Sequence, residues 1–353
     1  MKDNIVQQDL ESIVEGIGSD IYQLSGRTLL LTGGSGFLGS HFVALTQYLN
    51  QTRFKKPCSV ISIDNFALGR KTKNLITEIT DPNIEFVDHN ACLPYKTDKQ
   101  VDYIIHALGF ASPQFYKQHP IETIDGTIFG IKNALELTRE KKPRSLLFFS
   151  SSEIYGDADH NFVPTKETYK GNVSSIGPRS CYDESKRLGE ALCMAYHSQH
   201  QVPVKIVRPF NVYGPGMDVK DGRVIPRFVS QVIKDEPLTV YDKGSQTRTF
   251  CYITDAITGF YKVLLSNENG EVFNVGNDND EVNMKVLADS IVESLGRGKV
   301  SIVPYPTNYP QDEPSRRCPD LTKIKTRLGY EPRVDVKEGV KRTYEWLKDH
   351  MTI

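Results

Sequence analysis

The sequence has no long hydrophobic run, no closely spaced pair of cysteines and no excess of charge of either sign. Its longest apolar runs, such as 28–31 and 145–149, have the length of a strand, whereas a membrane-spanning helix needs about 20 apolar residues. The 43 Lys and Arg residues nearly balance the 44 Asp and Glu residues, which leaves a net charge of −1. We therefore expect neither a membrane partner nor a nucleic-acid partner held by overall charge.

The six cysteines are scattered along the chain, and no Cys-x-x-Cys motif is present. This spacing does not suit a metal site, and six cysteines in 353 residues do not make a disulfide framework. The N-terminus carries Asp3, Asp9, Glu11 and Glu15 and lacks the basic start and apolar middle of a signal peptide. These features predict a cytoplasmic protein with reduced cysteines and no metal.

Apolar residues recur every three or four positions from Val6 to Leu24, which predicts an amphipathic helix in the N-terminal extension, 1–25. Gly16 and Gly18 interrupt the pattern, so two short helices are also possible. A helix packed on its own chain is favoured over an arm that reaches a partner subunit.

From Gly26 onward, short β-rich runs alternate with helical stretches. Strands are expected at 28–32, 58–63, 84–87, 102–107, 145–151 and 203–208, and helices near 37–50, 120–139, 182–200, 223–234, 254–265, 283–294 and 336–348. Alternation of this kind predicts an α/β fold, a Rossmann-like doubly wound parallel sheet. The expected domains are a dinucleotide-binding domain at 26–209, with segments near 250–275 returning to it, and a smaller, intermixed α/β substrate-binding lobe at 210–353.

Three glycines with the spacing Gly-x-x-Gly-x-x-Gly follow the first strand and open a helix. Gly33 permits a tight turn, Gly36 allows a pyrophosphate to approach the backbone, and Gly39 lets helix and strand pack closely. The candidate cofactor-binding residues of the turn are Gly33, Ser35, Gly36, Phe37, Leu38 and Gly39. A glycine-rich turn that binds nothing is the alternative.

Asp64 ends the second expected strand, 25 residues after Gly39 (64 − 39), and 50–57 is predicted as a loop insertion between them. A carboxylate at this position would hold the ribose hydroxyls of the adenosine and repel a 2′-phosphate, which favours NAD over NADP. Arg70 and Lys71 keep NADP as a minor alternative.

Tyr182 and Lys186 stand four residues apart at the start of a helical pattern, so they share one helix face. A nearby ammonium would lower the pKa of the tyrosine and let Tyr182 act as a base. The motif is common, and a surface pair is the alternative. Ser151, at the end of an expected strand, strengthens the catalytic interpretation because its hydroxyl can share the proton of a substrate alcohol.

Together these motifs resemble the extended short-chain dehydrogenase/reductase family, whose members act on nucleotide sugars. The resemblance covers the chain from Gly26 to about Trp346, and within the family it is nearest to the UDP-glucuronate decarboxylases. The segments that carry it are 152–157 (SEIYGD), 176–187 (IGPRSCYDESKR), 208–215 (RPFNVYGP), 221–224 (DGRV), 236–241 (EPLTVY) and 246–250 (QTRTF).

The resemblance implies an NAD-dependent cycle in which a UDP-sugar is oxidised at carbon 4, loses CO2 as a β-keto acid and is reduced again. It implies the catalytic residues Tyr182, Lys186, Ser151, Glu153 and Arg317, with Glu153 near carbon 5 and Arg317 facing the departing carboxylate. It adds to the cofactor-binding residues Asn65, Asn90, Ala107, Tyr182 and Lys186. It implies the substrate-binding residues Ser112, Glu153, Arg179, Asn211, Arg223, Tyr241, Arg248 and Arg317.

Some positions separate the activities within the family. The 4,6-dehydratases carry an aspartate where this chain has Ser152, and 4-epimerases usually lack an acid at Glu153. The alternatives are another nucleotide-sugar 4-epimerase or 4,6-dehydratase and, more remotely, a non-catalytic NAD-binding protein. The chain departs from the decarboxylase pattern at Asn90, Thr127, Ser151 and 109–111, which leaves the exact sugar open. The family also implies a homodimer that pairs the helices near 120–139 and 182–200.

Overall fold

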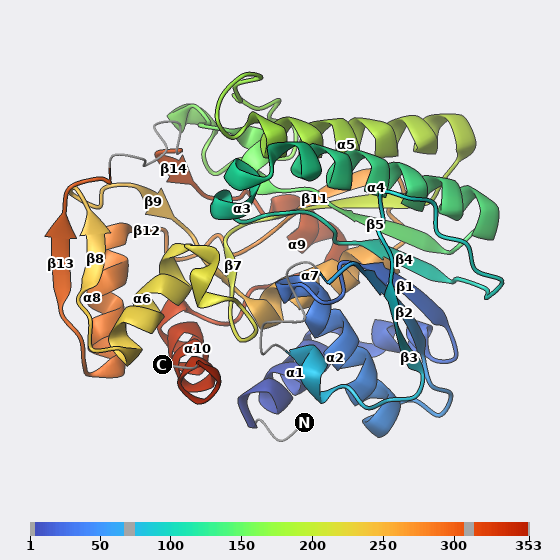
Figure 1. The fold of residues 1–353 in the computed structure, drawn as a ribbon, viewed down its shortest axis with the longest axis horizontal. Helices are drawn as coiled ribbons and strands as arrows, with labels where there is room; N and C mark the ends of the chain where they lie inside the picture. Colours follow the sequence, from blue (N-terminus) through green and yellow to red (C-terminus); the bar gives the residue numbers. More distant parts are fainter. Residues whose placement is uncertain (1–3, 67–74, 307–313, 352–353) are drawn as a thin grey trace.

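Seven parallel strands form the central sheet of the computed structural model, which describes residues 4–66, 75–306 and 314–351. The spatial order is β11-β6-β5-β4-β1-β2-β3 (Figure 1), so the chain winds outward from β1 in both directions. The predicted doubly wound parallel sheet is confirmed. The strands are β1 (Thr28–Thr32), β2 (Ser59–Asp64), β3 (Ile84–Asp88), β4 (Tyr103–His106), β5 (Ser145–Phe149), β6 (Val204–Pro209) and β11 (Glu271–Val275).

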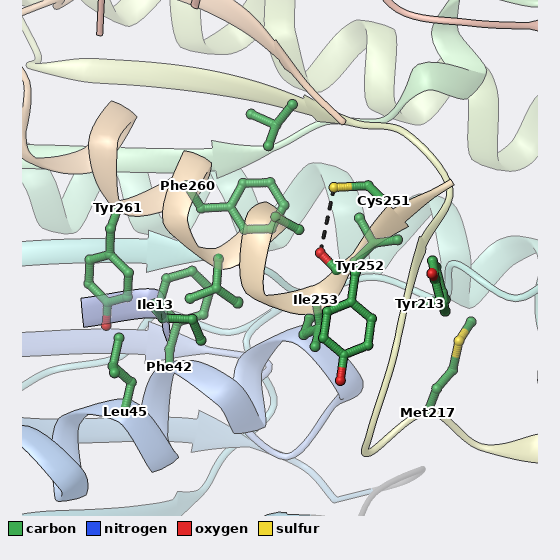
Figure 2. Packing of buried hydrophobic residues seen from close by; sticks show 14 of the residues in the cluster. Ile13, Phe42, Leu45, Tyr213, Met217, Cys251, Tyr252, Ile253, Phe260 and Tyr261 are labelled. Atoms are coloured by element: carbon green, nitrogen blue, oxygen red, sulfur yellow. Dashed lines mark hydrogen bonds between the residues drawn. The ribbon is translucent and has the colours of Figure 1, made fainter. Parts of the chain in front are cut away.

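Both faces of this sheet are buried under helices. Since successive side chains of a strand point to opposite faces, one strand contributes to two hydrophobic clusters. Leu29 and Leu31 of β1 belong to one hydrophobic cluster, and Leu30 belongs to the other. Helices α4 (Pro120–Lys141) and α5 (Ser180–His200) cover one face, and α2 (Phe37–Thr52) and α7 (Ile253–Leu265) cover the other (Figure 1). Phe42 of α2 and Phe260 of α7 stack with ring centroids 6.4 Å apart (Figure 2).

The expected N-terminal helix is present as α1 (Asn4–Ile17), and a 3₁₀ segment, η1 (Gly18–Leu24), follows it as the two glycines suggested. The apolar stripe of α1 packs on its own chain, and Ile13 lies in the same cluster as Phe42 (Figure 2). Buried Asp9 pairs with Arg342 at 3.0 Å and accepts a hydrogen bond from Tyr252 at 2.6 Å. The segment therefore joins the main core rather than extending from it.

The smaller lobe combines short strands with three longer helices. Its elements are α6 (Val224–Ile233), α8 (Met284–Leu295), α10 (Val336–His350), β8 (Leu238–Tyr241) and β13 (Val300–Val303), followed by two-residue strands β9 (Thr247–Arg248), β12 (Val282–Asn283) and β14 (Arg316–Arg317). The remaining elements are α3 (Pro113–Gln118), α9 (Thr322–Leu328), β7 (Val212–Tyr213), β10 (Cys251–Tyr252), η2 (Leu75–Glu78), η3 (Ser152–Tyr155), η4 (His160–Phe162) and η5 (Val219–Asp221).

The predicted loop insertion at 50–57 is wrong in its first part. Helix α2 continues to Thr52, and its last turn is closed by the Arg53 amide, which donates to the carbonyl of Leu49, while the Thr52 hydroxyl donates to the carbonyl of Tyr48. Asn50 then bridges the loop by bonding both the carbonyl and the amide of Cys58. All six cysteines, each within the described residues, are free thiols. Within those residues no helix is both long and apolar enough to cross a membrane.

Candidate active site

The glycine turn lies at the carboxyl end of β1, and its shape requires glycine at two positions. Gly33 has a φ of +81°, and a Cβ on Gly39 would lie 2.0 Å from the carbonyl oxygen of Gly33. The N-cap of α2 is Gly36, which has no side chain to cap the helix, so the first amides of α2 remain for a group that binds beside the turn. A pyrophosphate fits this cradle because the amides and the helix dipole both favour an anion.

Asp64 closes the neighbouring strand β2 and is buried beside the turn. One carboxylate oxygen accepts a hydrogen bond from the Ser35 amide at 3.1 Å, and the other accepts from the Phe66 amide at 2.8 Å. The acid is thus held at the position where the sequence expects an adenosine ribose. Arg70 and Lys71, on which the NADP alternative rests, lie outside the described residues.

Tyr182 and Lys186 occupy the first two turns of α5, and both are buried. Ser151, which follows β5 and caps η3, lies close enough to the Tyr182 hydroxyl to lower its pKa. The Lys186 ammonium donates to the Phe149 carbonyl at 2.8 Å and the Leu108 carbonyl at 3.4 Å. The structure therefore brings Ser151, Tyr182 and Lys186 together at the carboxyl edge of the sheet, the edge where α/β sheets bind ligands.

The pKa of Tyr182 is raised, so the expectation that Lys186 lowers it is wrong. Burial raises the pKa of Tyr182 to about 12, while its hydrogen bond with Ser151 acts in the opposite direction. The lysine ammonium lies 5.8 Å from the centre of the phenol ring and is directed to backbone carbonyls. A base at this position therefore needs further positive charge from what binds beside it.

Lys186 itself predicts a dependence of stability on pH. Burial lowers the pKa of Lys186 from 10.5 to about 8. Between these two pH values the unfolded chain binds the proton that the folded chain has released, so this residue makes folding more favourable as pH rises. We expect the urea midpoint of the native protein, relative to that of Lys186→Met, to increase between pH ~8 and ~10. An equal gap at both pH values would show that burial does not disfavour the ammonium.

Glu153 lies between two arginines that come from distant parts of the sequence. Its carboxylate forms a bidentate pair with Arg317, at 2.7 and 2.9 Å, and a second ion pair with Arg179. The side chains of Arg179, Arg317 and Glu153 are only 6%, 10% and 16% exposed. The site therefore holds an anion between two largely desolvated guanidinium groups, and guanidinium groups are the side chains best suited to bind a carboxylate.

Arg317 reaches Glu153 because β14 is fixed on both sides. On one side β14 pairs with β9, in the register Arg317 with Arg248. On the other side the Ser315 amide and hydroxyl both donate to Asp157, at 2.9 and 3.1 Å, and Thr165 forms a β-bridge with Pro319. The strand is thereby clamped next to η3, the turn that carries Glu153.

Two of the predicted substrate-binding residues lie next to the catalytic group. Arg223 forms a bidentate pair with Asp221, at 2.6 and 2.7 Å, and its charge lowers the pKa of Tyr182. Ser112 donates to the carbonyl of the same Asp221 at 3.0 Å. This pairing joins the start of α3 to the start of α6.

The contacts of the remaining predicted residues are with groups other than Ser151, Tyr182 and Lys186. Arg248 is buried and donates to the carbonyls of Thr247, Pro314 and Ser315, while Asn211 donates to the carbonyl of Thr249 at 2.8 Å. The Tyr241 ring packs under the guanidinium of Arg227, Asn65 and Asn90 are exposed after β2 and β3, and Ala107 follows β4 directly.

The sequence did not single out Tyr116, Asp183 or Asp221. Tyr116 of α3 stacks on Tyr182 with ring centroids 5.5 Å apart, and Asp183 lies 3.8 Å from Arg179. A tertiary ring stack leaves no signal in sequence spacing. The two aspartates could have been found from the sequence, because Asp183 follows Tyr182 directly and Asp221 lies two residues before Arg223.

This chain is similar in sequence and in fold to proteins of known activity. The model of the NAD dependent epimerase/dehydratase family matches residues 29–276. UDP-glucuronic acid decarboxylase 5 of Arabidopsis thaliana is 39% identical over 317 residues, which cover 90% of this chain and 88% of that protein. UDP-glucuronic acid decarboxylase 1 of Xenopus tropicalis is 38% identical, covering 92% and 73%. A dTDP-glucose 4,6-dehydratase from Streptomyces venezuelae, solved with NAD and TYD bound, superposes with a TM-score of 0.77 at 26% identity, covering 91% and 97%.

Proposed function

This chain belongs to the NAD dependent epimerase/dehydratase family, and from that premise we propose that it is a carboxy-lyase that converts UDP-glucuronate to UDP-xylose. The observation that carries the proposal is the Glu153–Arg317 pair beside Tyr182. A 4-epimerase or a 4,6-dehydratase of a neutral nucleotide hexose has no substrate carboxylate to bind, and an epimerase of a hexuronate would leave the carboxylate in place. The likeness to UDP-glucuronic acid decarboxylases over nine-tenths of the chain supports the same conclusion.

The turn residues 33–39 and Asp64 would hold NAD, the turn through its backbone amides and Asp64 through the adenosine ribose. Bound NAD supplies an acceptor, and later a donor, for the hydride at carbon 4 of the sugar, together with a positive charge on its oxidised ring. Ala107, Asn65 and Asn90 follow strand ends on the same edge of the sheet and complete the proposed cofactor site.

Tyr182 takes the proton from the 4-hydroxyl of the sugar. The Ser151 hydroxyl donates a hydrogen bond to the Tyr182 oxygen, which favours the phenolate. Lys186 is held by two backbone carbonyls with its ammonium 5.8 Å from the centre of the phenol ring, and its charge would stabilise the phenolate once the ammonium turns toward the Tyr182 oxygen. When the ketone at carbon 4 is reduced again, Tyr182 returns the proton. The three groups therefore move one proton out and back without net consumption.

With a ketone at carbon 4, the sugar is a β-keto acid. It loses CO2 because the electron pair of the bond between carbon 5 and the carboxyl carbon delocalises into an enolate. Arg317 and Arg179 would orient the substrate carboxylate and stabilise the negative charge that moves to the enolate oxygen. Glu153 holds both guanidiniums in place and shares their charge, so the substrate carboxylate is not fully neutralised before it leaves. Carbon 5 then takes a proton from water.

The nucleotide would be bound by the smaller lobe. Guanidinium groups suit the pyrophosphate, and amide or hydroxyl groups suit the sugar and uracil. The proposed residues are Ser112, Asn211, Arg223, Tyr241 and Arg248. Arg248 has donors directed to the carbonyls at 314–315, so pyrophosphate binding would compete with these carbonyls.

The decisive experiment is incubation with UDP-glucuronate and detection of CO2 and a nucleotide-linked pentose. Release of both in equal amounts, with no added reductant consumed, is the expected result. An unchanged hexuronate, or its 4-epimer, would reject the proposal and leave the 4-epimerase alternative. Loss of water from a neutral nucleotide hexose would indicate a 4,6-dehydratase instead.

The outer surfaces of α4 and α5, which lie side by side in Figure 1, expose several large apolar residues, including Ile121, Phe129 and Leu188. Exposed apolar surface of this kind marks an interface, and we propose that the two helices pair with their copies in a homodimer. We expect the Phe129→Glu/Leu188→Glu double variant to be monomeric by light scattering. Ile302→Glu, which changes an equally exposed residue of β13, should remain dimeric. A native protein that is monomeric at micromolar concentration would overturn this proposal.

Six free thiols suit a reducing compartment, where disulfides rarely form. We accordingly propose that the enzyme is cytoplasmic.

A further inference from the structure

A buried polar network lies behind the Glu153–Arg317 pair, and none of the steps above uses it. Its three central side chains, Tyr155, Arg208 and Asn274, are 3%, 7% and 0% exposed. They come from η3, β6 and β11, and Arg208 and Asn274 are directly paired in the register of the sheet. Burying a polar side chain costs folding free energy unless it is hydrogen-bonded, so these three side chains need partners inside the protein.

The hydrogen bonds of this network run in one direction. The Arg208 guanidinium can only donate, and it donates to the Tyr155 hydroxyl at 2.7 Å. Tyr155 must then donate its single proton onward, to the Oδ1 of Asn274 at 2.7 Å. The amide nitrogen of Asn274 in turn donates to the carbonyls of Thr165, at 2.8 Å, and Asp320, at 3.1 Å.

Each end of the network holds a segment that carries a catalytic group. Tyr155 is the last residue of η3 and lies two residues from Glu153. Asp320 lies three residues after Arg317, and Thr165 forms the bridge that fixes the same strand. Arg208 is anchored in turn to Glu190 of α5 by a bidentate pair at 2.8 and 2.6 Å, one helical turn from Lys186.

We propose that Tyr155 and Asn274 are positioning residues that set the Glu153 turn and the Arg317 strand at the separation needed for decarboxylation. The inference rests on the proposed function, because it assigns the network to the carbon 5 step. Loss of the Tyr155 hydroxyl or of the Asn274 amide leaves the Arg208–Glu190 anchor of α5 in place, so we expect a larger effect on the carbon 5 step than on oxidation by Tyr182. A displacement of about 1 Å in a catalytic group can lower the rate about 100-fold, so the loss of a single hydrogen bond of the network is enough to slow decarboxylation.

The test is Tyr155→Phe, which removes one hydroxyl and keeps the ring under the Arg208 guanidinium. In this variant oxidation should continue while CO2 release slows about 10- to 100-fold. NADH should therefore accumulate during turnover, which a general loss of folded enzyme does not produce. Tyr169→Phe is the matched control, because the Tyr169 ring lies 6.3 Å from that of Tyr155 outside the network. It should accumulate no NADH.

Crystal structures of both variants add a readout independent of activity. Tyr155→Phe should separate Glu153 from Arg317, and Tyr169→Phe should not. Should Tyr155→Phe fail to fold, Asn274→Ala removes the link to Asp320 and retains the Tyr155–Arg208 bond, with the same outcomes expected. The inference is wrong if the pair stays in place, or if oxidation and CO2 release fall by one common factor. If the native enzyme releases no CO2, the proposed function fails, and the crystal comparison still decides the positioning role.

Discussion

Tyr182→Phe should lower turnover of UDP-glucuronate by about 10²- to 10⁴-fold and leave NAD affinity nearly unchanged. The variant loses only the hydroxyl that takes the carbon 4 proton, and the buried ring stays stacked on Tyr116. In the proposed site the NAD affinity depends instead on the glycine turn and Asp64, which belong to other elements. Turnover is measured as CO2 release, and NAD binding by calorimetry on the same preparation.

Tyr196→Phe serves as the control for this prediction. Tyr196 lies on the same helix, but its hydroxyl bonds Glu136 on the outer surface. The control should release CO2 at the native rate. If Tyr182→Phe keeps more than about a tenth of native turnover, Tyr182 is not the base, since general bases contribute more than this.

Glu153→Ala should reduce both stability and decarboxylation. Its removal leaves Arg179 and Arg317, both largely buried, without the carboxylate that lies between them. Breaking a buried ion pair on one side costs about 3 kcal/mol or more of folding free energy. CO2 release should fall by about 100-fold, because the guanidiniums that stabilise the enolate lose their placement. Chemical unfolding and CO2 release measure the two effects.

Glu281→Gln is the matched control for the Glu153 prediction. Glu281 forms a bidentate pair with Arg316, the residue before Arg317 on the same strand, at 2.8 Å for both contacts. This outer pair is more exposed and lies outside the proposed site, so turnover should stay within about twofold of native. If Glu153→Ala releases CO2 as fast as Glu281→Gln, the ion pair has no part in the chemistry.

The parts of this structure that follow from sequence are local or periodic. The glycine turn follows from three glycines between an apolar strand and a helix, and the shared face of Tyr182 and Lys186 follows from a spacing of four residues. The alternation of strands and helices gives the parallel sheet in the same way. The stripe from Val6 to Leu24 gives α1, because 3.6-residue periodicity needs no tertiary information.

Other features depend on contacts between distant segments, which spacing does not encode. Glu153 and Arg317 are 164 residues apart in the chain, and their association was suggested only by family resemblance. Two-residue strands such as β9 and β14 are too short to carry a pattern. The raised pKa of Tyr182 was not predicted either. Packing decides that the phenol is buried and that the Lys186 ammonium is directed to backbone carbonyls, and neither follows from spacing.

The most direct measurement of redox-neutral decarboxylation is the mass of the pentose nucleotide formed from UDP-glucuronate in deuterated water. Carbon 5 takes its proton from solvent and carbon 4 recovers the hydride it gave up, so the account predicts one non-exchangeable deuterium, at carbon 5 only. A pentose with deuterium at carbon 4, or with none, would contradict it.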